Sequence, residues 1–134
     1  MQKAINTQIS VYFCIMAFIQ AECLSLLSQG HDVLVTTARG PDDPMVARVA
    51  EASTTYIATS SDVNARLGTA LGQLVSDIRR KTKMQRIAIS GGDTSGHALT
   101  QLGADALSAV APLAPGAPLC RVHTRSDPAI NGLE

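Results

Sequence analysis

The stretch Arg86-Ile-Ala-Ile-Ser-Gly-Gly-Asp-Thr-Ser-Gly-His97 is the part of the sequence on which the fold depends most. Its apolar, β-branched run at 87–89 predicts a short strand. Two glycines end that run, and three small polar residues then begin a helical pattern. A strand, a glycine turn and a helix N-terminus in this order gather unpaired N–H groups and the positive end of a helix dipole. The stretch therefore predicts a cradle for an anion such as a phosphate.

Helical and strand patterns alternate on both sides of this stretch. Apolar residues at helical spacing predict helices over 7–28, 45–52 and 61–81, and a further helix over 95–103 follows the glycine turn. Short apolar runs predict strands over 32–37, 87–89, 106–110 and 119–122, whereas 53–60 shows no clear period. The alternation predicts an α/β fold, a layered domain with a largely parallel sheet flanked by helices.

Two segments rich in proline and glycine, 38–44 and 111–118, are predicted to be loops. In parallel sheets, ligands bind beyond the carboxyl ends of the strands. We therefore expect the loop at 39–44 and the glycine turn at 91–96 to lie at the same edge of the sheet.

Length and composition limit the possible functions. The chain has 134 residues, which suits a single domain, and its 46% apolar and 16% charged residues are typical of a globular protein. Eleven basic residues balance eleven acidic ones, and no basic run exceeds Arg79-Arg80-Lys81. This balance argues against a nucleic-acid partner. We interpret the basic run as a complement to the dipole at the end of the helix over 61–81.

The cysteines and the apolar amino-terminal segment indicate the compartment. Cys14, Cys23 and Cys120 form no CxxC motif and leave an odd thiol, which favours a reduced, cytoplasmic protein with buried cysteines. The apolar segment 9–27 contains Gln20 and Glu22, so it predicts a buried helix rather than a membrane span or a signal peptide.

The glycine turn matches neither of the common nucleotide motifs. Gly91 and Gly96 have the G-x-x-x-x-G spacing of a P-loop, but His97 and Ala98 stand where that motif requires Lys and Ser or Thr. The G-x-G-x-x-G pattern of dinucleotide-binding folds is also absent. The alternative to an anion cradle is a structural turn in which Asp93 or Thr94 caps the helix. In a cradle, we expect Asp93 to face a ribose hydroxyl, a magnesium ion or its own helix N-terminus, because its carboxylate would repel a bare phosphate.

Other polar residues offer weaker candidates. Asp42 and Asp43 form an acidic pair that we interpret as turn formers in preference to metal ligands, and Arg39 is either an anion clamp or an ordinary loop cation. No metal site is predicted, because the three histidines lack ligand spacing: His31, His97 and His123. Ser90 and Ser95 lack the G-x-S-x-G motif, which counts against a hydrolase.

Three motifs, in this order and spacing, resemble the four-carbon acid sugar kinases. They are Thr-Ala-Arg-Gly-Pro-Asp-Asp-Pro (37–44), Ser-Gly-Gly-Asp-Thr-Ser-Gly (90–96) and Ala-Pro-Leu-Ala-Pro-Gly-Ala-Pro-Leu-Cys-Arg (111–121). Kinases of this family phosphorylate threonate, erythronate and oxo-tetronate compounds with ATP. Their amino-terminal domain binds the sugar acid, and their carboxy-terminal domain binds the nucleotide. Residues 1–134 look like the second domain alone, a fragment of a two-domain phosphotransferase.

The resemblance implies specific residues, cofactors and partners. It implies ATP and Mg²⁺ as cofactors, Gly116 as a minor contact, and as nucleotide-binding residues Gly91, Gly92, Asp93, Thr94 and Ser95. The sugar acid would bind to a missing amino-terminal domain that carries an Asp-Asp-x-Thr-Gly-type motif. Nucleotide-site segments are also expected just before Thr7 and just beyond Glu134. No catalytic residue is implied, so this chain alone is not expected to turn over.

A second hypothesis does not depend on catalysis. The chain would then be a non-catalytic α/β module whose apolar first helix associates with a partner or with a second copy to form a homodimer. Exposure of that helix would favour this alternative.

Overall fold

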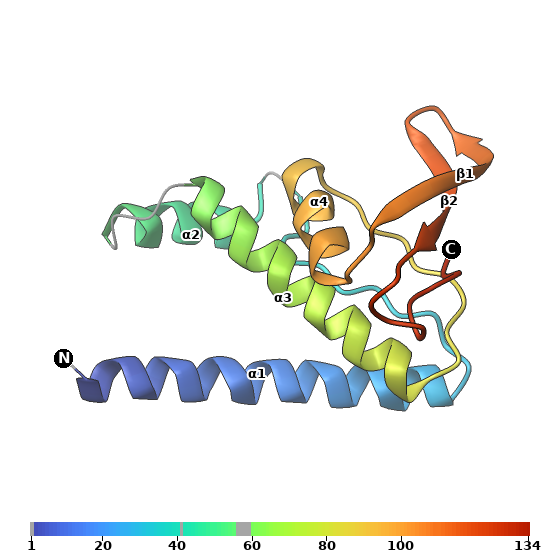
Figure 1. Ribbon diagram of the computed structural model, residues 1–134. Coiled ribbons are helices and arrows are strands. Elements are labelled where there is room, and N and C mark those ends of the chain that lie inside the picture. The colour runs from blue at the N-terminus through green and yellow to red at the C-terminus, as the bar shows by residue number, and fades with distance from the viewer. Residues whose placement is uncertain (1, 41, 56–59) are drawn as a thin grey trace. The chain divides into compact units, whose positions relative to one another are not determined.

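The computed structural model describes the backbone of residues 2–40, 42–55 and 60–134, and side chains from residue 15 onward other than 41, 53–60 and 93. The chain divides into two compact units, residues 1–34 and 35–134. Figure 1 shows the order of the elements along the chain. Each unit is described by itself below.

The first unit is dominated by one long helix. α1 (Gln2–Ser28) confirms the predicted helix and begins earlier than expected. Its described side chains Ile15 and Phe18 are 53% and 66% exposed. Among the described residues, no helix has the length and apolar character needed to cross a bilayer. The strand predicted over 32–37 is wrong, because 31–36 has no strand pairing and Leu34 is 88% exposed.

Three helices form the first part of the second unit. They are α2 (Pro44–Thr55), α3 (Ser60–Lys81) and α4 (Gly92–Gln101). α2 extends the helix predicted over 45–52, so residues 53–55 are helical, whereas 56–59 lie outside the described residues. Buried Leu74 and Ile78 lie on one side of α3, which packs along α4. The helix predictions on both sides of the glycine turn are therefore confirmed.

The described strands form a single antiparallel hairpin. β1 (Ala106–Ala114) pairs with β2 (Ala117–His123) around a tight turn in which Gly116 has φ +77°. The predicted largely parallel sheet is therefore wrong, and so is the predicted loop over 111–118. Pro112 and Pro118 face each other in the register. A two-stranded sheet tolerates them because every strand in it is an edge strand and can turn groups without an N–H outward.

The run at 87–89 is not assigned as a strand either. Its backbone nevertheless forms two bonds with Glu134: the Ile87 amide donates to the Glu134 carbonyl at 2.7 Å, and the Glu134 amide donates to the Gln85 carbonyl at 3.0 Å. Bonds from one residue to the two neighbours of its opposite are the pattern of a parallel pair. The parallel pairing in the described part of the chain is limited to this one rung.

The core of the second unit lies beneath the hairpin and the last turn of the chain. It consists of Leu102, Val122, Ile130 and Leu133, all buried, with Ile87 and Ile89 among the half-buried residues packed against it. The apolar run that predicted a strand therefore contributes to the core through its side chains. Ion pairs hold the last turn in place, with Arg80 at 2.7 Å from Asp127 and Arg121 at 2.6 Å from Glu134.

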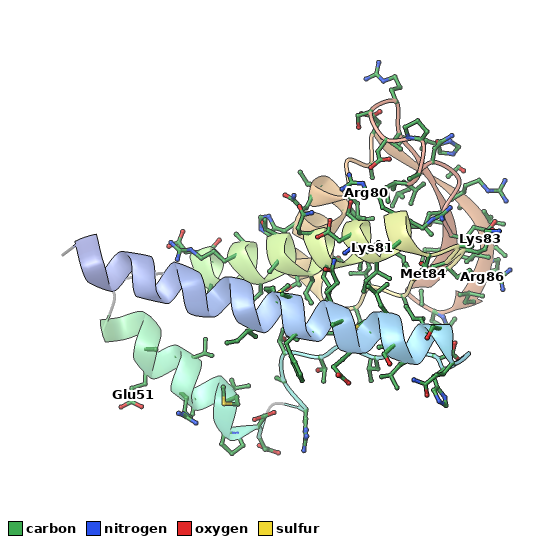
Figure 2. The ribbon with its side chains drawn as sticks, turned by 90° about the horizontal axis from the view of Figure 1, so that it is seen from below. Glu51, Arg80, Lys81, Lys83, Met84 and Arg86 are labelled. Atoms are coloured by element: carbon green, nitrogen blue, oxygen red, sulfur yellow. The ribbon has the colours of Figure 1, made fainter. Side chains whose placement is uncertain are left out.

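Several basic residues lie at the C-terminal end of α3 and in the segment that follows it. Figure 2 labels them there: Arg80, Lys81, Lys83 and Arg86. Arg80 also contacts Asp77 at 3.7 Å, and Arg86 contacts Glu134 at 3.5 Å. Cations at a helix C-terminus complement its dipole, which agrees with the structural interpretation of this basic run.

Candidate functional site

The glycine turn opens directly into α4. Gly91 is the N-cap residue, with φ +122° and ψ 130°, and no side-chain cap is found among the described side chains. A positive φ of this kind suits glycine and strains other residues. An added Cβ at Gly92 would meet nothing within 4 Å, so open space lies beside the start of the helix. Gly91, and not Asp93 or Thr94, is therefore the N-cap residue. The choice between an anion cradle and a structural turn stays a prediction.

The first turn of α4 leaves its backbone available to a ligand. The Ser95 amide donates to the Gly91 carbonyl at 3.0 Å, and the Ser95 hydroxyl donates to the Gly92 carbonyl at 2.8 Å. Helix N–H groups that precede the first intrahelical bond have no partner within the helix. Here they coincide with the exposed glycines Gly91 and Gly92. This geometry suits close approach of an anionic group.

The remaining predicted residues of the turn differ in what the structure shows. Thr94 is half-buried, and its side chain lies 3.6 Å from the position of a Cβ at Gly91. The Ser95 hydroxyl is engaged within the helix. The Asp93 side chain lies outside the described side chains, so its predicted orientation stays a prediction. The five residues are consecutive and share one turn.

The segment before the turn is held by its side chains and by its backbone. Ile87 and Ile89 pack on the core, while the Ile87 amide is bonded to Glu134. The Glu134 carboxylate lies between two guanidinium groups, with Arg121 at 2.6 Å and Arg86 at 3.5 Å. These groups, with the Arg121 hydrogen bond first, hold the pKa of Glu134 below its ordinary value. The chain therefore enters Gly91 from an anchored segment.

The loop at 37–44 has a structural role in the described residues. Asp43 accepts hydrogen bonds from the amides of Met45 (2.9 Å) and Arg39 (2.8 Å), and these bonds hold its pKa below the ordinary value. Asp43 is thus the residue that caps α2, a role that its interpretation as a turn former did not specify. Asp42 and Arg39 are exposed.

The loop and the glycine turn are not brought together by a sheet. No hydrogen bond or ion pair between described residues joins 37–44 to the Gly91–Ser95 turn. Their predicted convergence depended on parallel strands that the described chain does not contain. The physical basis for that prediction is therefore lost.

The other candidates lie apart from the turn or are unsupported. The His123 Nε2 atom is 2.8 Å from the Ser108 hydroxyl on the hairpin, and Ser90 has no hydrogen-bonded base among the described residues. No group of three His, Cys, Asp or Glu side chains among the described residues is placed to hold a metal. Of the cysteines, Cys23 is buried and Cys120 is half-buried, both as free thiols, and the Cys14 side chain lies outside the described ones.

Two residues that the sequence analysis missed face α4, and one of them faces the candidate turn. Gly68 and Gly72 lie on α3 where it meets α4, and Gly68 faces the Thr94 backbone. Their signal in the sequence is a G-x-x-x-G spacing inside a helical pattern, which places both on one face. Such a face indicates close helix packing, but the sequence alone does not identify the partner helix.

Comparisons with known proteins agree with this geometry. Residues 14–133 match the family model described as a nucleotide-binding C-terminal domain. A 3-oxo-isoapionate kinase from Paraburkholderia graminis is 36% identical over 108 residues, which cover 81% of this chain and 23% of the kinase. The chain thus spans about a quarter of the length of this relative. No solved structure matches the chain.

Proposed function

The chain belongs to the nucleotide-binding C-terminal domain family, and from that premise we propose that it binds ATP for a kinase of four-carbon sugar acids. The observation that carries the proposal is the N-terminus of α4, where Gly91 has a positive φ and no described side chain caps the helix. Backbone N–H groups and the helix dipole at such a terminus favour phosphate oxygens.

Each residue of the turn has a role in this proposal. Gly91 and Gly92 let the phosphate chain approach the backbone, and Thr94 adds the last free amide of the first turn. Ser95 fixes the turn through its bond to the Gly92 carbonyl. Asp93 serves the nucleotide through a ribose hydroxyl or a hydrated magnesium ion.

Magnesium enters this proposal together with the nucleotide. Mg²⁺ in nucleotide sites keeps several waters and is held by one or two carboxylates plus the phosphates, so it needs no preformed cage of side chains. At this turn, Asp93 is the carboxylate that we assign to share the ion with the phosphates. When bound, the ion would neutralise phosphate charge during phosphoryl transfer.

The sugar acid is assigned to another part of the protein. The relative named as a 3-oxo-isoapionate kinase is over four times as long as the matched segment, since that segment covers 23% of it. We place the acid and its phosphoryl-accepting hydroxyl on an amino-terminal domain, and we assign no catalytic residue to this chain. By itself, the chain binds nucleotide without transferring phosphate. The free thiols Cys23 and Cys120 suit a reducing, cytoplasmic setting.

Calorimetry with MgADP and MgATP tests this function. We expect the folded chain to bind both, and we expect Gly92→Asp to weaken binding because it places a carboxylate beside the phosphates. Thr100→Asp is the matched control, since it adds the same charge near the other end of α4, at an exposed residue. The proposal would be contradicted if the wild-type chain did not bind MgADP. It would also be contradicted if Gly92→Asp bound MgADP as tightly as the wild type does.

The exposed side of α1 supports a second candidate function. Ile15 and Phe18 expose large apolar side chains, and such surfaces in soluble proteins often serve association. The chain would then form a homodimer or bind a partner through α1, with or without nucleotide. Sedimentation velocity should show a wild-type dimer that Phe18→Ser converts to monomer. A wild-type monomer at all concentrations tested would exclude self-association.

A further inference from the structure

Gly68 and Gly72 bring α3 and α4 into unusually close contact. A Cβ at Gly68 would lie 2.5 Å from the His97 Cβ and 2.8 Å from the Thr94 carbonyl oxygen. A Cβ at Gly72 would lie 2.6 Å from the Ala98 carbonyl oxygen. Real Cβ atoms essentially never approach other atoms to less than 3.0 Å. At the observed separation of the two helices, only glycine fits at both positions.

The backbone conformation gives no other reason for these glycines. Both lie well inside α3, and neither has the positive φ that favours glycine. Glycine in the middle of a helix is destabilising relative to alanine, because it loses more conformational freedom on folding. The close approach of α4 is what the missing side chains permit.

The contact reaches the candidate nucleotide turn directly. Thr94 is the third residue of α4, and its backbone faces Gly68 while its side chain lies against Gly91. The other end of α4 is bonded to α3, because the side-chain Nε2 of Gln101 donates a hydrogen bond to the side-chain oxygen of Gln73 at 3.0 Å. A side chain added at Gly68 would therefore push the start of α4 away from α3, while the end of α4 stays bonded to α3.

We propose that Gly68, and to a smaller extent Gly72, are positioning residues for the Gly91–Ser95 turn, an inference that rests on the proposed nucleotide binding. For a Cβ at Gly68, the His97 Cβ must retreat from 2.5 Å to the 3.4 Å at which ordinary contact begins. This moves the first turn of α4 by roughly 1 Å, a displacement that can cost up to about a hundredfold in a preorganised site. Gly72 faces Ala98 and Gln101, which lie farther along α4.

The test compares Gly68→Ala, Gly72→Ala and Thr69→Ala in the full chain. Thr69 is an exposed α3 neighbour, so its substitution controls for a change of sequence within the helix. Calorimetry measures MgADP affinity, and amide NMR spectra without nucleotide report on Gly91, Gly92 and Thr94. We expect affinity to fall about tenfold or more in Gly68→Ala, by less in Gly72→Ala and not at all in Thr69→Ala. The chemical shifts of the Gly91, Gly92 and Thr94 amides should change most in Gly68→Ala, less in Gly72→Ala and least in Thr69→Ala.

The outcomes separate this inference from the proposed function. A wild-type chain that binds no nucleotide overturns the proposed function, while the NMR comparison still tests the positioning of the turn. Unmoved amide signals with unchanged affinity in Gly68→Ala overturn the positioning role. If Gly68→Ala does not fold, Gly72→Ala must move the Thr94 and Gly92 signals more than Thr69→Ala does. Failure of both glycine variants to fold would also overturn it, since the glycines would then be required for folding in general.

Discussion

Asp43 and Gly91 begin their helices in opposite ways. One Asp43 carboxylate oxygen accepts from the Met45 amide at the start of α2, and the other accepts from the Arg39 amide in the preceding loop. By contrast, α4 begins at Gly91 with no cap from a described side chain. A capped terminus has its donors satisfied, and an uncapped one keeps them for a ligand. This difference between the two residues supports the binding role that we propose for the Gly91 turn.

Removal of the Asp43 cap should destabilise the fold. Asp43→Ala leaves the amides of Met45 and Arg39 without their acceptor, so we expect a lower urea midpoint. Asp42→Ala, one residue earlier and exposed, should leave the midpoint unchanged. Equal midpoints for the two variants would contradict the assignment of Asp43 as the cap of α2.

At the level of elements, α4 is short and depends on its neighbours. A helix of ten residues is marginal in isolation, so packing on α3 must supply most of its stability. Gly68 and Gly72 make that packing close, while Gly96 on α4 itself has nothing within 4 Å of its missing Cβ. Glycines with the same helical backbone thus have different tolerance for a side chain.

Gly96→Ala should stabilise the second unit. The added methyl group meets open space, and the unfolded chain loses freedom, so we expect a gain of about 0.5–1 kcal/mol in the free energy of unfolding. Urea denaturation followed by circular dichroism measures it. A loss of stability would mean that Gly96 needs the flexibility of glycine, contrary to the contacts in the structure.

The sequence predicted helices better than strands for a physical reason. The period of α3 comes from its own buried face, with Leu74 and Ile78, and needs no knowledge of distant segments. A strand needs a paired backbone, and the apolar run at 32–37 acquires none, while the run at 87–89 acquires only the single rung with Glu134. The proline-rich run at 111–118 forms a hairpin because an edge strand tolerates residues without an N–H. The glycine turn was predicted locally, whereas its contact with Gly68 depends on tertiary packing.

At the scale of the whole molecule, the last turn of the chain completes the core. Ile130 and Leu133 are the largest fully buried side chains among the described residues. They pack with Leu102 from the end of α4 and Val122 from β2. Residues near position 134 therefore stabilise elements that lie earlier in the sequence.

Truncation of Ile130 should be severe. Ile130→Ala leaves a cavity in this core, and we expect it to lower the free energy of unfolding by about 2–5 kcal/mol. Leu113→Ala, at a side chain that is 68% exposed on the hairpin, should stay within about 0.5 kcal/mol of the wild type. Chemical denaturation of both variants checks this, and similar effects would contradict the assigned core.

Acid should destabilise the second unit. The pKa values of Asp127 and Glu134 are lowered, chiefly by hydrogen bonds from Arg80 and Arg121, and those of Asp43 and Asp105 are lowered chiefly by backbone amides. Groups with a depressed folded-state pKa stabilise the fold above their unfolded values of 3.8 and 4.5, and this stabilisation is lost as pH falls.

The urea midpoint should therefore hold steady from pH 7 to about pH 5 and then fall toward pH 3. Glu134→Gln should show a smaller fall than the wild type, because one of the titrating groups has been removed. A midpoint that is constant or rises on acidification would contradict this prediction.

The single parallel rung at Glu134 affects how binding experiments are prepared. Because residue 134 pairs with the backbone on either side of Arg86 in parallel, any residues fused after it run in the same direction as 87–90, toward Gly91. A purification tag at that end would be guided alongside the turn whose nucleotide binding is being measured. Assays of that turn are best made with the carboxyl end untagged, and a tagged sample compared with an untagged one would show whether the fused segment competes.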